Sequence, residues 1–181
     1  MKKLNTFLLG SLFVALLAIN SCDPFDELYL TLAMDIQLDT EGAGPNISII
    51  DTLCLSEFED YDDNKDKIEE IRYVSSAYLT LDATVGLQAQ TLTLYLYQED
   101  GITELFNYTI QNFSADSTKI KPLEIVLTQQ EKNNIHTYLA NPQEDKCFIG
   151  KLTATNVQPN NSLYFLKSKL DFLTELKIKP Q

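Results

Sequence analysis

The densest cluster of oxygen-bearing side chains lies in an acidic segment in the first half of the chain. Calcium takes six to eight oxygen ligands, and Asp60, Asp62 and Asn64 have the 1-3-5 spacing of a calcium-binding loop. Lys65 then stands where that loop needs a glycine, and Ile71 stands where it needs a bidentate glutamate. We therefore interpret the segment as a solvated acidic loop at the start of a helix, with a calcium site as the weaker alternative.

The residues that usually carry catalysis are scarce. His136 is the single histidine, so the chain cannot build a zinc site or a general base that rests on a second histidine. The serines lack a nucleophile elbow of the Gly-x-Ser-x-Gly type, and carboxylates are too numerous for a glycosidase pair to be singled out. Arg72 is the only arginine, and there is no tryptophan. We predict neither enzymatic activity nor a cofactor.

Three tyrosines could form a binding face. Tyr78, Tyr95 and Tyr97 alternate with leucines in segments of strand period, so we expect them to point outward. Exposed tyrosines can stack on sugar rings or contact a protein, and ordering their side chains costs little entropy. Ordinary cross-strand pairing of aromatic side chains explains the same pattern without a ligand, and the lack of tryptophan weakens the case for sugar.

The N-terminal residues have the pattern of an export signal. Lys2 and Lys3 precede an apolar run over 7–19, which is shorter than the about 20 residues that span a bilayer. Residues 17–22 resemble a bacterial lipobox, which implies cleavage before Cys22 and three acyl chains on that residue. Such an anchor holds stably, since each buried methylene contributes about 0.8 kcal/mol. A buried N-terminal helix is the alternative.

The chain thus divides into a signal peptide (1–21), a lipidated acidic tether (22–27) and one domain (28–181). Without the signal peptide it carries 12 basic and 26 acidic residues, a net charge of −14. This charge argues against a nucleic-acid partner and against binding of an anionic membrane surface through basic residues. The tether resembles the export signal of surface lipoproteins of Bacteroidota, which implies an outer-membrane, cell-surface location. Pro24 and Phe25 interrupt the acidic run, so the periplasmic leaflet remains the alternative.

The mature chain has the period of a β protein. Apolar and polar residues alternate from Leu28 onward, glycine and proline fall mostly between the alternating runs, and helices are short. We predict an antiparallel β-sandwich of about eight strands, Greek-key or immunoglobulin-like. The expected strands are 28–38, 47–55, 71–81, 90–98, 102–110, 123–127, 147–155 and 163–178. A hairpin is expected at 99–101, and Gly150, inside a strand, suggests a bulge.

Two short helices are expected in the crossovers. Thr128 and Glu131 form a capping-box pattern, which predicts a helix that ends near Ala140. Its inward residues are expected to be Ile135, Tyr138 and Leu139. A second helix is expected over 62–70.

Cys54 and Cys147 remain once Cys22 carries lipid. In an oxidising compartment they could form a disulfide that closes a long loop and contributes about 4–5 kcal/mol on the loop-entropy model. The alternative is two separate buried thiols that behave as small apolar side chains. The sequence leaves this open, because it does not show that the two strands are neighbours.

Two tripeptides resemble the Asp-Ser/Thr-apolar sites at which Bacteroidota attach O-glycans to exported proteins. They are centred on Thr52, within an expected strand, and on Ser117, within an expected loop. The resemblance implies modification of these hydroxyls, and Ser117 is the better candidate.

The order of signal, Cys22, long alternating strand, hairpin and capped late helix resembles the small all-β lipoproteins of Bacteroidota. This resemblance spans essentially the whole chain and implies a fold and a location, but no activity. We therefore expect a non-catalytic accessory subunit of a cell-envelope complex, with another outer-membrane protein as its partner. The alternative is a surface glycan-binding lipoprotein that uses the tyrosines.

Overall fold

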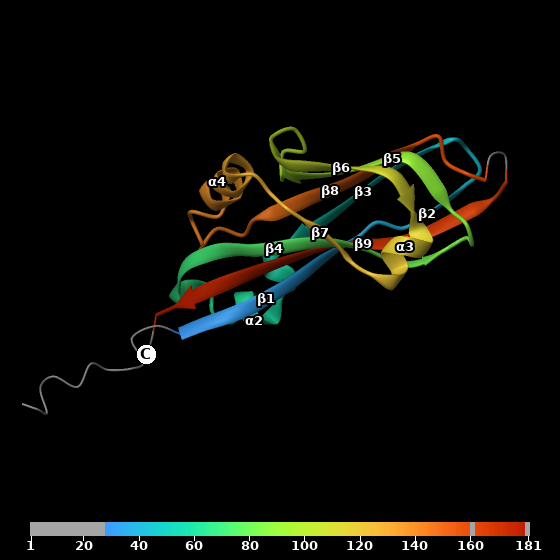
Figure 1. Cartoon of the computed structure of the whole chain (residues 1–181). Coiled ribbons are helices and arrows are strands. Elements are labelled where there is room, and N and C mark those ends of the chain that lie inside the picture. The colour runs from blue at the N-terminus through green and yellow to red at the C-terminus, as the bar shows by residue number, and fades with distance from the viewer. Residues whose placement is uncertain (1–27, 160–161, 180–181) are drawn as a thin grey trace, which may run out of the picture.

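Two antiparallel sheets lie face to face in the computed structural model, which describes residues 28–159 and 162–179 (Figure 1). In this part of the chain, sheet A has the strand order β1-β9-β4-β7, and β2 pairs with β9 beyond the end of β1. Sheet B has the order β3-β8-β5-β6. The predicted class, an antiparallel β-sandwich, is confirmed.

The elements have the following bounds. Sheet A consists of β1 (Leu28–Gln37), β2 (Thr40–Gly42), β4 (Ile68–Ala83), β7 (Leu123–Ile125) and β9 (Tyr164–Ile178). Sheet B consists of β3 (Asn46–Cys54), β5 (Gln88–Gln98), β6 (Glu104–Ser114) and β8 (Cys147–Thr155). The helices are α2 (Glu59–Asp62), α3 (Ala115–Ile120) and α4 (Gln129–Tyr138), with 3₁₀ turns η1 (Leu55–Glu57) and η2 (Lys65–Lys67).

The inward side chains of both sheets form one core. On β5, Leu92, Leu94 and Leu96 are at most 1% exposed, as period-two alternation requires. Across the interface, the rings of Phe148 on β8 and Phe172 on β9 lie 5.4 Å apart between their centroids. Each such side chain contributes about 1.5–3 kcal/mol by leaving water, so the apolar interface holds the two sheets together.

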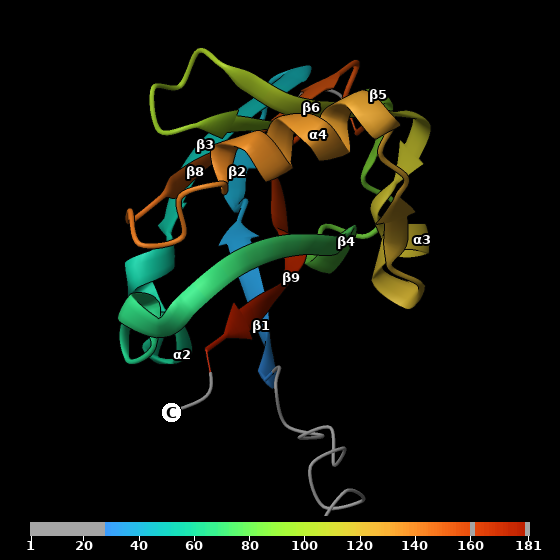
Figure 2. The same cartoon turned by 90° about the vertical axis from the view of Figure 1, so that its left-hand side faces the viewer.

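Helix α4 closes the side of the sandwich between β4 and β6 (Figure 2). Its capping box is formed as predicted: the Glu131 N–H donates to Thr128 Oγ1 at 3.3 Å, and the Thr128 N–H donates to Glu131 Oε2 at 2.7 Å. The three expected inward residues, Ile135, Tyr138 and Leu139, are buried. Because α4 lies over this open side, it does not cover the outer face of sheet B, and no other helix of the described residues has contacts that place it there.

The helix expected over 62–70 is wrong. Helix α2 ends at Asp62, and β4 begins at Ile68, whose side chain is buried in the core. β4 carries three register shifts against β9, so its apolar residues do not keep a strict period of two. The short elements β2 and α3 were not expected. Ser117, which we expected in a loop, lies in α3.

Gly150 does not mark a bulge, because β8 pairs with both β3 and β5 in continuous register around it. Its role is close packing between the sheets. A Cβ atom at this position would lie 2.8 Å from Cγ2 of Ile36 on β1. Glycine therefore allows β8 and β1 to approach each other across the core.

Candidate binding face

The outer face of sheet B is an open surface of polar and aromatic side chains, which we call the tyrosine face. Its residues alternate with the buried leucines of β5 and with the inward residues of the neighbouring strands. They are Ser48, Ile50 and Thr52 on β3; Ile149, Lys151, Thr153 and Thr155 on β8; Thr91, Thr93, Tyr95 and Tyr97 on β5; and Glu104, Asn107, Thr109 and Gln111 on β6. All are half-buried or exposed, so the face is accessible.

Two of the three tyrosines predicted to face outward do so. The rings of Tyr95 and Tyr97 are nearly parallel, with an interplanar angle of 12° and centroids 5.8 Å apart. Desolvation, the nearby charge of Glu104 and the neighbouring Tyr95 raise the pKa of Tyr97. Its hydroxyl therefore stays protonated at neutral pH and can donate a hydrogen bond to a ligand.

Tyr78 is a correction to the predicted face. It lies on β4 in sheet A and is 0% exposed, with its ring centroid 6.0 Å from that of Phe113 in sheet B. Burial raises the pKa of its hydroxyl. The register shift between Tyr73 and Ser75 changes which side chains of β4 point inward. Tyr78 is therefore a core residue and takes no part in the binding face.

Lys151 was missed by the sequence reasoning and lies at the centre of the tyrosine face. It is the register partner of Tyr95 on one side and of Ile50 on the other. Its Nζ atom lies 5.8 Å from the centroid of the Tyr95 ring, a cation–π distance. Within the described residues it forms no ion pair, whereas Lys169, among other cations, is paired with a carboxylate.

Hydroxyl groups occupy much of the rest of the tyrosine face. Thr91 and Thr155 share a hydrogen bond of 2.6 Å, and Thr93 and Thr109 share one of 3.0 Å. Each hydroxyl has one donor and two acceptor sites, so it retains capacity for water or a ligand. The tyrosine face can therefore form many weak hydrogen bonds with a ligand around one aromatic pair and one cation.

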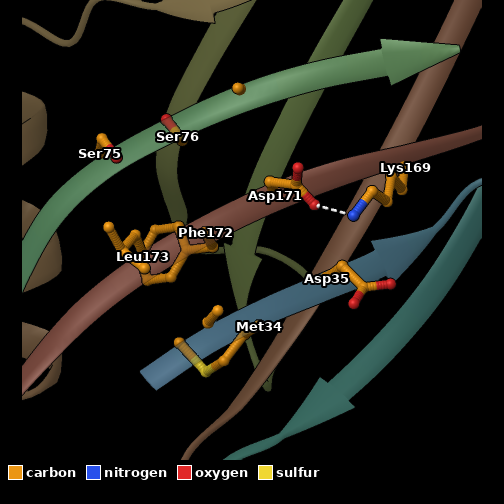
Figure 3. Close-up of a pocket in the computed structure, with 10 residues that line it drawn as sticks. Met34, Asp35, Ser75, Ser76, Lys169, Asp171, Phe172 and Leu173 are labelled. Atoms are coloured by element: carbon orange, nitrogen blue, oxygen red, sulfur yellow. Dashed lines mark ion pairs between the residues drawn. The ribbon is translucent and has the colours of Figure 1, made fainter. Parts of the chain in front are cut away.

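A depression of about 330 Å³ lies on the outer face of sheet A and is lined by residues of β1, β4 and β9, among them Asp35, Ser75 and Lys169 (Figure 3). Lys169 Nζ lies 2.7 Å from Asp171 Oδ1. This hydrogen bond, with the charges of Asp171 and Asp35, raises the pKa of Lys169. The amine stays protonated, so it is unsuited to act as a nucleophile or general base.

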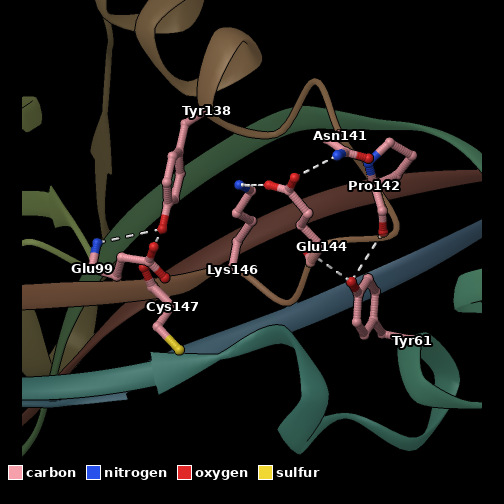
Figure 4. A network of polar contacts seen from close by, with 8 residues as sticks. All are labelled: Tyr61, Glu99, Tyr138, Asn141, Pro142, Glu144, Lys146 and Cys147. Atoms are coloured by element: carbon pink, nitrogen blue, oxygen red, sulfur yellow. Dashed lines mark hydrogen bonds and ion pairs between the residues drawn. The ribbon is translucent and has the colours of Figure 1, made fainter.

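A polar network fixes the loop that leads into β8 (Figure 4). The Tyr61 hydroxyl lies 3.0 Å from the carbonyl oxygens of both Pro142 and Glu144. The Tyr138 hydroxyl donates to the Cys147 carbonyl at 2.7 Å and accepts from the Glu99 N–H at 3.3 Å. Burial, followed by nearby carboxylate charge, raises the pKa of Tyr61. This network orders the start of the strand that carries Lys151.

The same region contains a disulfide between Cys54 and Cys147. The two residues are register partners on the adjacent strands β3 and β8, which the sequence alone did not show. The bridge links the end of β3 to the beginning of β8, and the polar loop before β8 is additionally held by hydrogen bonds from Ser56 to Asp145.

The weak calcium candidate does not form a ligand set. The Asn64 side-chain amide donates to the Asp60 carbonyl at 3.0 Å, and Lys65 Nζ lies 3.0 Å from Asp62 Oδ1. The ammonium group of Lys65 thus already pairs with the Asp62 carboxylate, which a calcium ion would need as a ligand. No group of three or more histidine, cysteine or acidic side chains in the described residues could hold a metal.

The other predicted sites are placed as follows. Cys22 and the whole export signal lie outside the described residues. Thr52 is exposed on the edge strand β3, Ser117 is exposed on α3, and His136 is exposed on α4. Within 28–159 and 162–179, no helix has the length and apolar character needed to cross a membrane.

No protein-family model matches this chain, and no curated protein matches it. Among solved structures, it is similar to the 60-mer BFDV capsid protein (TM-score 0.40, 10% identity, covering 86% of this chain and 97% of that one). It is also similar to the structure of tobacco necrosis virus (TM-score 0.39, 10% identity, covering 85% of this chain and 98% of that one). A third similar structure is that of infectious bursal virus derived T=1 particles (TM-score 0.35, 12% identity). This chain spans 36% of the length of that protein. At this level the likeness concerns the β-sandwich alone.

Proposed function

We propose that this chain is a non-catalytic lipoprotein of the outer membrane that serves as an accessory interaction subunit of a cell-envelope complex. The observation that carries this proposal is the tyrosine face, an exposed sheet surface with a nearly parallel tyrosine pair and a central lysine that forms no ion pair within the described residues. Aromatic side chains are typical anchors of binding surfaces. The partner of first choice is another outer-membrane protein.

The position of β1 fits an anchor at Cys22. Leu28 pairs with Ile178 at one end of the sandwich, and the six tether residues from Cys22 can span at most about 20 Å when extended. A lipid on Cys22 would therefore hold this end close to the membrane. The tyrosine face lies on the side of the sandwich, so a neighbour in the same membrane could reach it.

A glycan is the second candidate for the ligand. The near-parallel Tyr95 and Tyr97 rings and the surrounding threonine hydroxyls favour it, because sugars offer both C–H surface and hydroxyl groups. The two candidates use the same face, and only the occupant differs.

Replacing Cys22 by serine tests the anchor. Wild-type protein is expected to have an intact mass that begins at Cys22 and includes three acyl chains, and Cys22→Ser is expected to leave an uncut precursor or a lipid-free product. Affinity purification from detergent-solubilised membranes should recover an outer-membrane protein with the wild type and much less with Cys22→Ser. A mature wild-type chain that begins elsewhere and carries no lipid would contradict the proposal.

A further inference from the structure

The tyrosine face combines three features that together identify a ligand class: one cation without a carboxylate partner, an aromatic pair, and a surrounding field of hydroxyls. We propose that it binds an acidic glycan, with an anionic group of one sugar at Lys151 and the adjoining sugar surface against Tyr95 and Tyr97. This inference rests on the proposed role of the tyrosine face as the binding surface. It selects the second candidate ligand, a glycan, and specifies that this glycan is acidic.

The positive charge of Lys151 has no counter-charge within the described residues. The chain has a formal net charge of −12, yet no described carboxylate pairs with this lysine. Glu104 is the carboxylate of the tyrosine face, and it accepts a hydrogen bond from Asn107 at 2.6 Å. A half-buried cation with no internal counter-charge complements an anionic ligand.

Lys151 is held in a central position on the tyrosine face. It lies on β8, an inner strand of sheet B, with β3 on one side and β5 on the other. Contact with Tyr95 holds its ammonium group over the aromatic ring, so binding need not order a freely moving side chain. A ligand anion at Nζ is thereby brought next to the two tyrosine rings.

The shape and the hydroxyl groups of the surrounding surface favour a sugar polymer. The four paired strands make an open surface, which suits an extended polymer better than a small molecule. Next to the Lys151–Tyr95 row lies a row of Ser48, Thr153, Thr93 and Thr109, all hydroxyl side chains. Hydroxyls can bond to sugar hydroxyls directly or through water.

Native affinity electrophoresis of the full-length lipoprotein, solubilised in an uncharged detergent, tests the proposal. The gels contain polygalacturonate as the carboxylated probe, dextran sulfate as the sulfated probe, or dextran as the neutral probe. At 0.15 M salt, repulsion from remote carboxylates of the chain is screened beyond about 8 Å. We expect an anionic polymer to retard the protein and dextran not to. The two anionic arms distinguish carboxylate from sulfate recognition.

Variants locate the binding. Lys151→Gln and Tyr95→Ala are each expected to weaken retention about tenfold, whereas Lys151→Arg and Tyr95→Phe keep the charge or the ring and should retain most of it. Lys167→Gln makes the same charge change at an exposed position of sheet A and should have no effect. Unchanged thermal unfolding midpoints establish that the variants are folded.

The outcomes separate this inference from the proposed function. Equal retardation by dextran, retardation by none of the polymers, or unchanged retention of Lys151→Gln would each overturn the acidic glycan. If Tyr95→Ala and Lys151→Gln instead abolished recovery of an outer-membrane protein from solubilised membranes, the tyrosine face would still be the binding surface and its occupant would be a protein.

Discussion

The double substitution Cys54→Ala and Cys147→Ala is expected to lower the free energy of unfolding by about 4–5 kcal/mol. The disulfide joins residues separated by 93 positions, and on the loop-entropy model a cross-link of this span restricts the unfolded chain by roughly that amount. The two cysteines are directly opposed on β3 and β8. Their loss also removes a covalent support of the strand that carries Lys151.

Urea unfolding of the wild type with and without reductant, beside the double variant, measures this effect. Reductant should lower the wild-type midpoint to near that of the variant and should leave the variant unchanged. Thiol labelling of the denatured, unreduced wild type should find neither Cys54 nor Cys147 reactive, since the sulfur of Cys22 is expected to be a thioether. Two reactive thiols, or equal stability of the two proteins, would be incompatible with the bridge.

Gly150→Val is expected to destabilise the domain by about 3 kcal/mol, near the upper end of the usual cost of overpacking a core. A Cβ atom at position 150 would lie 2.8 Å from Cγ2 and 3.0 Å from Cδ1 of Ile36. Ile36 is itself 2% exposed. Its branched side chain has no solvent-exposed space into which to move, so the two sheets would have to separate locally.

The cause can be isolated by a double-mutant cycle. Ile36→Ala alone should lower the free energy of unfolding by about 2–5 kcal/mol through the cavity that it creates. The double variant with Gly150→Val should lose less stability than the sum of the two single losses. Gly44→Val is the matched control: its nearest atom is the Asn46 carbonyl oxygen at 4.0 Å, so a change below about 0.5 kcal/mol is expected. Strict additivity at Gly150 and Ile36 would refute the packing explanation.

Local patterns predicted those elements whose formation depends on neighbours in sequence. The capping box of α4 is a contact between Thr128 and Glu131, three residues apart, and it forms as expected. Over 91–97, β5 keeps a period of two in its burial, so the outward direction of Tyr95 and Tyr97 followed from the sequence. β4 does not keep that period, because its pairing with β9 shifts register at three places, and the prediction for Tyr78 failed there.

The composition of the tyrosine face depends on contacts that are remote in sequence. On β8, Lys151 has the opposite parity to the inward residues Leu152 and Ala154, so the sequence pattern alone indicates that its side chain points outward. Its contact with Tyr95, however, requires that β8 and β5 be neighbours. The Cys54–Cys147 bridge likewise required the pairing of β3 with β8. Strand order arises from packing of the whole domain, so it cannot be inferred from the hydrophobic periodicity of one segment.

Photo-cross-linking in living cells tests whether the tyrosine face is the binding surface. A benzophenone amino acid would replace Thr109, exposed on the tyrosine face, or Thr31, exposed on β1 of sheet A. A higher-mass adduct is expected from position 109 and is lost when Lys151→Gln is added, and no adduct is expected from position 31. Adducts from position 31 alone, or equally from both positions, would contradict binding at the tyrosine face.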